Sequence, residues 1–314
     1  MRRLLLHRRA RATVAAGLAL LTGTALAQTA YKYRDADGNW VFSDRAATAK
    51  AGETLPLEHE PEAGLHIEVA PHRAGAATEL VGTNGCLCAI TLRLVIVKSE
   101  LTALPSGSRY RTVLEPGESK ILAASPGVVA DRDGLKYQWT AVLGSPTAVH
   151  TPPRPYRAPF PLSETHLITQ AYPSRATHGT PDSLYAVDIS LPDGTPIYSA
   201  REGMVVNLRH DSFRGGVEAT MLDQANVVEI LHDDGTIAIY AHLHWDSIQV
   251  RIGQHVARGQ YLANSGNTGF TSGPHLHFAV LRNAGDNSVS VPIQFAGLGG
   301  VAVTPVTSMP LTAY

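Results

Sequence analysis

Residues 273–278 have the sequence Gly-Pro-His-Leu-His-Phe, which predicts a strand that carries two histidines. Leu276 and Phe278 favour a strand, and alternate side chains of a strand share a face, so His275 and His277 are predicted to point the same way. Two neighbouring imidazoles can both bind a metal, or one can act as an acid or base beside it. The alternative interpretation is a polar strand face turned to solvent.

The N-terminus has the pattern of a secretory signal peptide. Five arginines precede an apolar run at residues 13–21, and residues 25–27 are Ala-Leu-Ala, a small-x-small cleavage pattern. We therefore predict a signal peptide at residues 1–27. An uncleaved membrane anchor is the alternative, but the run is shorter than the roughly 20 apolar residues that span a bilayer, and no later stretch reaches that length.

Composition indicates a globular protein. The chain has 314 residues, 44% of them apolar, and at roughly 150 residues per domain this length predicts two or three domains. Without residues 1–27 the chain has 21 basic and 27 acidic residues, a net charge of −6 (21 − 27). This balance argues against nucleic acid as a partner.

Two small domains are predicted before the histidine-rich region. In residues 28–60, aromatic residues alternate on either side of an Asp-Gly pair, which is typical of a tight hairpin. This segment resembles a small N-terminal domain of unknown function found in secreted proteobacterial proteins. Residues 66–144 contain short β-rich runs separated by glycine-containing turns and predict a β-sandwich. Cys86 and Cys88 could form a strained disulfide or remain free, and two thiolates alone do not complete a metal site.

The rest of the chain is predicted to be a linker, a third domain and a tail. Six prolines predict a semi-rigid linker at residues 145–161. The third domain, at residues 162–296, is again almost all β. Residues 297–314 form a C-terminal tail, either poorly ordered or covering a groove.

A hairpin is the clearest local element of the third domain. Residues 226–232 and 236–243 alternate around Asp234-Gly235, which suits a two-residue turn. Strand alternation then predicts that Tyr240 and His242 share one face, opposite the core. Glycine-punctuated turns also occur in lipoyl and biotinyl carrier domains, but a carrier needs a lysine and residues 160–314 contain none.

Four motifs in a fixed order resemble the lysostaphin-like, or LytM-type, zinc endopeptidases. They are the glycine-flanked run at residues 194–206, Tyr-Ala-His-Leu at 240–243, Gly-Asn-Thr-Gly at 266–269, and Gly-Pro-His-Leu-His-Phe at 273–278. The resemblance covers roughly residues 166–295. It implies a mainly antiparallel β fold of the duplicated hybrid motif type, with a groove at a metal site. It also implies hydrolysis of peptide bonds in peptidoglycan.

The same resemblance implies roles for individual residues. Asp188 and His277 would be zinc ligands, and His242 and His275 the unligated catalytic pair. The family usually places its first ligand four residues before the aspartate, where this chain has Leu184.

We expect His178 to replace the missing ligand, because the Gly-Thr-Pro-Asp segment after it describes a loop that can turn it back. His166 and a metal-free site are the alternatives. Two Zn²⁺-binding histidines and one aspartate would leave a coordination position for water.

Two residues are candidates for substrate binding. Tyr240 could line the groove or simply pack against the sheet, and Asn226 could bind substrate backbone or cap a turn.

The sequence is compatible with two functions, an enzyme and a binding module. The first is a periplasmic or secreted zinc endopeptidase acting on peptidoglycan. The second is a catalytically inactive module that binds the wall or activates an amidase. The chain keeps both the His-x-His and Tyr-Ala-His segments, which favours the enzyme.

Overall fold

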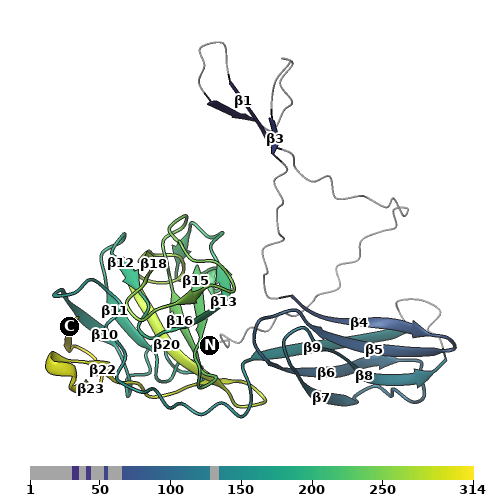
Figure 1. Ribbon diagram of the computed structural model, residues 1–314. Coiled ribbons are helices and arrows are strands. Elements are labelled where there is room, and N and C mark those ends of the chain that lie inside the picture. The colour runs from purple at the N-terminus through teal and green to yellow at the C-terminus, as the bar shows by residue number, and fades with distance from the viewer. Residues whose placement is uncertain (1–29, 35–39, 44–52, 56–65, 128–133) are drawn as a thin grey trace. The chain divides into compact units, whose positions relative to one another are not determined.

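The computed structural model describes residues 30–34, 40–43, 53–55, 66–127 and 134–314 of the chain (Figure 1). The predicted signal peptide lies outside these residues. Within the described part, no helix combines the length and apolar character that crossing a membrane requires. The described residues are almost entirely β-strands, as the sequence predicts.

The N-terminal unit contains three short strands, β1 (Ala30–Arg34), β2 (Trp40–Ser43) and β3 (Glu53–Leu55). They form one antiparallel sheet in the order β2-β1-β3. The pairing of Arg34 with Trp40 confirms the hairpin predicted from the alternating aromatics.

Residues 66–144 form the predicted sandwich of two antiparallel sheets. One sheet contains β4 (Ile67–Ala74), β5 (Ala77–Asn84) and β8 (Ser119–Pro126). The other contains β6 (Ile90–Ser99), β7 (Arg109–Leu114) and β9 (Leu135–Leu143). Alternate residues of β5 and β6 are buried, so the two inner faces supply the core.

Cys86 and Cys88 are free thiols in the core of the sandwich. Burial raises the pKa of Cys86 to about 12 and that of Cys88 to about 11. Both groups are therefore protonated near neutral pH and unreactive as nucleophiles.

The third domain is built on a nine-stranded sheet with the order β17-β13-β15-β16-β20-β11-β10-β24 and with β21 paired to β20. Its pairings are antiparallel, as predicted. The strands are β10 (Thr165–Gln170), β11 (Val187–Ser190), β13 (Gly203–Arg209), β15 (Val227–Leu231), β16 (Ile237–Ala241), β17 (His255–Val256), β20 (His275–Asn283), β21 (Ser288–Ser290) and β24 (Pro310–Thr312).

Smaller elements complete this domain. Two antiparallel pairs and one parallel pair of short strands join its loops: β12 (Pro196–Tyr198) with β18 (Tyr261–Asn264), β22 (Phe295–Ala296) with β23 (Ala302–Val303), and, in parallel, β14 (Gly215–Gly216) with β19 (Gly269–Phe270). Two 3-10 turns, η1 (Ala219–Met221) and η2 (Leu298–Gly300), are the helical elements of the described residues.

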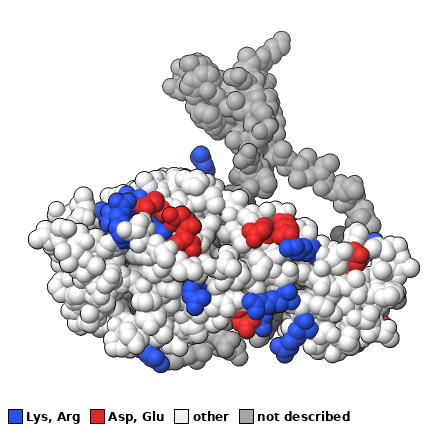
Figure 2. All heavy atoms as spheres, turned by 60° about the horizontal axis from the view of Figure 1, so that its bottom comes forward, with Lys and Arg blue, Asp and Glu red and all other residues white. Residues whose placement is uncertain are grey.

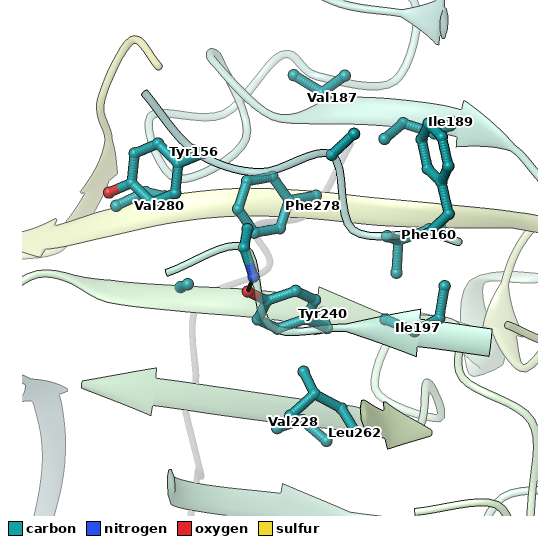
Figure 3. Close-up of a cluster of buried hydrophobic side chains, with 14 of the residues drawn as sticks. Tyr156, Phe160, Val187, Ile189, Ile197, Val228, Tyr240, Leu262, Phe278 and Val280 are labelled. Atoms are coloured by element: carbon teal, nitrogen blue, oxygen red, sulfur yellow. Dashed lines mark hydrogen bonds between the residues drawn. The ribbon is translucent and has the colours of Figure 1, made fainter. Parts of the chain in front are cut away.

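One face of the large sheet packs into the main hydrophobic core. Tyr240 and Phe278 lie directly opposite each other on β16 and β20, and both are fully buried (Figure 3). The phenol oxygen of Tyr240 accepts a hydrogen bond from the Ala200 amide at 2.7 Å. The opposite face of β20 therefore carries His275 and His277, as the His-x-His spacing predicts.

The predicted linker at residues 145–161 is instead part of this core. Tyr156 and Phe160 are fully buried there, and the backbone of Tyr156 pairs with Phe295. A high proline content stiffens a segment but does not keep its aromatic side chains from packing.

The predicted separate tail at residues 297–314 is also wrong. Strand β24 extends the main sheet beside β10, and Leu311 and Ala313 are buried in the core. The segment contains no charged side chain, so its burial carries no charge-desolvation cost.

Charged side chains of both signs are interspersed on one face of the molecule. On the face drawn in Figure 2, blue and red residues lie beside one another and neither sign forms a continuous field.

Candidate metal centre

Asp188 and His277 lie side by side on neighbouring strands of the large sheet. They are direct partners in the pairing of β11 with β20, so their side chains share one face. His277 Nδ1 lies 2.8 Å from Asp188 Oδ1. The placement follows from strand alternation, which puts Val187 and Phe278 on the core face and their sequence neighbours on the other.

His178 reaches the same carboxylate from the loop between β10 and β11. Its Nε2 lies 3.1 Å from Asp188 Oδ2, and its ring meets that of His277 edge to face at 5.1 Å. A tight turn shapes the loop, with the Ser183 amide donating to Thr180 O and the Thr180 amide to Ser183 Oγ. The turn brings His178 back to the sheet, where only 2% of the residue is exposed.

The donor atoms of His178, Asp188 and His277 all lie within 4.8 Å of one another. Among the described residues, these three side chains form a group that could hold a metal ion. His166, the alternative ligand, pairs with Glu164 at 2.8 Å instead.

The carboxyl group of Asp188 is held as an anion. Burial alone would raise its pKa, but hydrogen bonds from His178 and His277 outweigh burial and hold the pKa of Asp188 well below its usual range. One carboxylate oxygen and two imidazole nitrogens form a donor set that can hold a metal ion.

His242 and His275 lie beside this group, with their ring centres 4.6 Å apart. His242 Nδ1 lies 2.7 Å from Thr268 O, and His275 Nδ1 lies 2.8 Å from Gly273 O. Because a carbonyl oxygen can only accept, both Nδ1 atoms carry the proton in the neutral rings. Each Nε2 is then left as the atom that can exchange a proton.

The environment of His242 favours its neutral form. Burial, together with the neighbouring His275 and His277, lowers the pKa of His242 to about 3. A neutral imidazole can accept a proton at Nε2 during a reaction.

The predicted face of Tyr240 and His242 is wrong. β16 ends at Ala241, and His242 has a φ of 65°, so the backbone leaves the alternating strand conformation at this residue. Tyr240 therefore points into the core, whereas His242 turns to the metal-binding face. A buried Tyr240 cannot line a substrate groove.

Asn226 does not face a substrate site either. It is fully buried, its amide nitrogen donates to Ser212 O and Leu243 O, and its Oδ1 accepts from the Ser212 amide. Asn226 therefore caps neighbouring turns, which was the alternative to substrate binding that the sequence suggested.

Sequence patterns did not identify the residues that orient the two histidines. The carbonyl groups of Thr268 and Gly273 act through their backbone, so no side-chain type marks them. Their only sequence signal is the glycine-rich segment between residues 266 and 273.

A loop at residues 211–224 flanks this segment. The Gly269 amide donates to Arg214 O, and the Thr271 amide donates to Gly216 O. The loop lines an open depression of about 270 Å³ and carries the exposed ring of Phe213.

Two family models match parts of the chain. Residues 183–290 match the model of peptidase family M23, and residues 17–64 match that of a domain of unknown function, DUF4124. The M23 match includes Asp188, His242, His275 and His277 and begins after His178.

Curated relatives match part of the chain. Peptidoglycan DD-endopeptidase ShyA of Vibrio cholerae is 32% identical over 125 residues, which are 39% of this chain and 26% of the relative. Lysostaphin of Staphylococcus simulans is 32% identical over 127 residues, which are 38% of this chain and 24% of the relative. The chain thus spans about a quarter of the length of these curated relatives. The solved structure of lysostaphin from S. simulans matches with 25% identity and a TM-score of 0.30, covering 40% of this chain and 47% of that one.

Proposed function

Because the chain carries a domain of peptidase family M23, we propose that it is an exported zinc endopeptidase that hydrolyses peptide bonds in peptidoglycan. One observation carries the proposal. Three metal-binding side chains, His178, Asp188 and His277, converge beside a pair of oriented histidines. The relatives named as peptidoglycan endopeptidases support the substrate class.

In this proposal His178, Asp188 and His277 hold the zinc ion. Two imidazoles and one carboxylate, with a position left open, are a donor set that catalytic zinc sites use. When bound, zinc supplies a Lewis acid that polarises a carbonyl group and lowers the pKa of water.

His242 and His275 move the protons. One ring accepts a proton from the attacking water at Nε2. A ring that carries a proton at Nε2 donates a hydrogen bond to the developing oxyanion or passes the proton to the leaving amine. The Thr268 and Gly273 carbonyls hold each ring in the required tautomer.

The loop at residues 211–224 is the proposed contact for the substrate chain. It lies against the segment that orients His242 and His275, and its exposed Phe213 offers an apolar surface. Export to the periplasm is proposed from the N-terminal sequence pattern, which suits a protein whose substrate lies outside the cytoplasm.

The inactive wall-binding or amidase-activating module is the competing function. It requires no metal and no proton transfer, so it gives no reason for five converging histidine and aspartate side chains. We therefore favour the enzyme.

The test measures zinc content and hydrolysis together on the protein lacking residues 1–27. We expect one zinc per chain and new amine termini after incubation with peptidoglycan. Chelation should stop the reaction, and added zinc should restore it. Two separate substrates, dimers cross-linked through D-amino acids and peptides joined by glycine bridges, would show which type of bond the protein cuts.

His277→Ala is the control, and it should lack both zinc and activity. A wild-type protein that binds peptidoglycan without zinc or new termini would overturn the enzyme and support the binding module.

A further inference from the structure

Gln170 lies in the same row of the sheet as the candidate metal ligands. It pairs with Asp188 between β10 and β11, and Asp188 pairs with His277 between β11 and β20. Paired residues share a face, so one row across three strands presents Gln170, Asp188 and His277 together. Gln170 is itself 9% exposed.

The surroundings of Gln170 determine the orientation of its amide group. One terminal atom of the amide lies 3.0 Å from the His178 backbone nitrogen and 3.2 Å from the Thr177 backbone nitrogen. Backbone N–H groups can only donate, so this atom is the amide oxygen. The amide nitrogen then faces Thr177 Oγ1 at 3.1 Å.

The same oxygen lies 3.1 Å from His178 Nδ1. An amide oxygen can only accept, so His178 Nδ1 carries a proton, and the proton that Nε2 donates to Asp188 is the one that a metal ion would displace. Nε2 is the atom that faces Asp188. The Gln170 side chain therefore selects the tautomer that a metal ligand at this position needs.

His178 depends on this contact more than a histidine on a strand would. His277 is held by strand β20, whereas His178 comes from a loop. Gln170 binds the loop at three donors, which are the backbone N–H groups of Thr177 and His178 and the ring Nδ1–H. One side chain fixes both the path of the loop and the orientation of the ring.

We infer that Gln170 is the positioning residue that allows a loop histidine to replace the ligand absent at Leu184. This inference rests on the metal site of the proposed function. Groups that accept a hydrogen bond from the second ring nitrogen of a metal-binding histidine change metal affinity by roughly 10- to 100-fold when removed.

The experiment compares the zinc affinity of four proteins by competition with a chromogenic chelator. Gln170→Leu removes the acceptor at similar volume and should weaken zinc binding roughly 10- to 100-fold. Gln170→Glu keeps an acceptor at the same place and should stay within roughly threefold of wild type, because carboxylates commonly fill this role. Thr165→Ala, on the same strand and away from the site, should match wild type.

Long-range ¹H–¹⁵N NMR supplies a second readout that a loss of stability alone would not change. In the wild-type and Gln170→Glu proteins loaded with zinc, His178 should show a protonated Nδ1 and a metal-bound Nε2. The His178 signals are assigned as those missing from His178→Ala.

The outcomes separate this inference from the function on which it rests. A wild-type protein that binds no zinc would overturn both. Zinc in the wild type with equal affinity in Gln170→Leu, or zinc bound through Nδ1 of His178, would overturn the role of Gln170 alone. An equal loss in Gln170→Glu and Gln170→Leu would also overturn it, because the acceptor would then be irrelevant.

Discussion

At the scale of single residues, the histidines near Asp188 divide into two groups with different expected phenotypes. His178 and His277 contact the carboxylate at 3.1 and 2.8 Å. His275 Nε2 lies 3.9 Å from it, and His242 contacts Thr268 instead. These distances support the proposed division, in which the first group binds the metal and the second transfers protons.

His178→Ala should reduce zinc affinity as severely as His277→Ala, because each removes one of three protein ligands. The loss should exceed the roughly 10- to 100-fold cost of outer-shell changes. Chelator competition measures it. His166→Ala is the control, since His166 pairs with Glu164, and it should keep full affinity. Full affinity in His178→Ala would show that the loop histidine is not a ligand.

His242→Ala and His275→Ala should keep stoichiometric zinc and lose the rate of hydrolysis. Loss of a positioned acid or base typically costs about 10²- to 10⁴-fold. Metal analysis and single-turnover digestion, run on the same samples, separate the two effects. If either variant loses its metal, that histidine is a ligand and the roles must be exchanged.

At the scale of elements, the hairpin of β15 and β16 shows what the sequence could predict. Alternating apolar residues predicted its two strands, and the Asp-Gly pair predicted a turn at Gly235. The turn itself has three residues, 233–235, because the backbone of His232 still pairs with Thr236 and Gly235 takes a φ of 79°. The predicted face of Tyr240 was wrong because the strand alternation was extended to His242, whereas the strand ends at Ala241.

Asn226→Ala should destabilise this hairpin without changing the metal ligands. The substitution removes hydrogen bonds with Ser212 and Leu243 inside the protein, and it leaves their buried groups unpaired. Such a loss costs about 2–4 kcal/mol. Urea denaturation measures the free energy of unfolding, and zinc content of the folded fraction should stay unchanged. An unchanged unfolding free energy would contradict the capping role.

His232, at the same turn, should make stability depend on pH. Its Nδ1 donates to Glu202 O, its buried Nε2 has no hydrogen-bond partner among the described residues, and burial lowers its pKa from 6.5 to about 4. Below pH 6.5 the unfolded chain binds a proton that the folded chain does not, so stability falls as pH falls from 6.5 toward 4. The full effect is about 3 kcal/mol.

Unfolding free energies of wild type and His232→Asn between pH 7 and pH 4 test this. The variant should show a shallower fall than the wild type over this range. Parallel pH profiles would mean that another group is responsible.

At the scale of the whole molecule, tertiary packing determines which segments belong to the core, and composition did not predict this for two segments. Residues 145–161 were predicted as a linker from proline content, and residues 297–314 as a tail from position. Both supply side chains to the core, because Tyr156, Phe160 and Leu311 find apolar partners far away in sequence. By contrast, the His-x-His face was predictable, since it depends only on local alternation.

Strand β20 connects the candidate metal site with the sandwich. It carries His275 and His277 at one end and Asn283 at the other. Asn283 is fully buried, and its amide nitrogen donates to Thr91 Oγ1, Val142 O and Gly144 O of the sandwich. Val206 and Ile237 of the peptidase region also pack into the core of the sandwich. We therefore expect the two regions to unfold in one transition.

Asn283→Leu should weaken that coupling, because it leaves two buried carbonyl groups and a hydroxyl without their donor. We expect a loss of about 2–4 kcal/mol in urea denaturation, and a transition that separates when followed by probes in each region. The control is Asp286→Ala on the same turn. Its ion pairs with Arg93 and Arg111 are 3.8 Å long and largely exposed, so the cost should stay below about 1 kcal/mol. If Asp286→Ala proved as damaging as Asn283→Leu, surface charge rather than the buried amide would hold the sandwich to the strand that carries the proposed metal ligand His277.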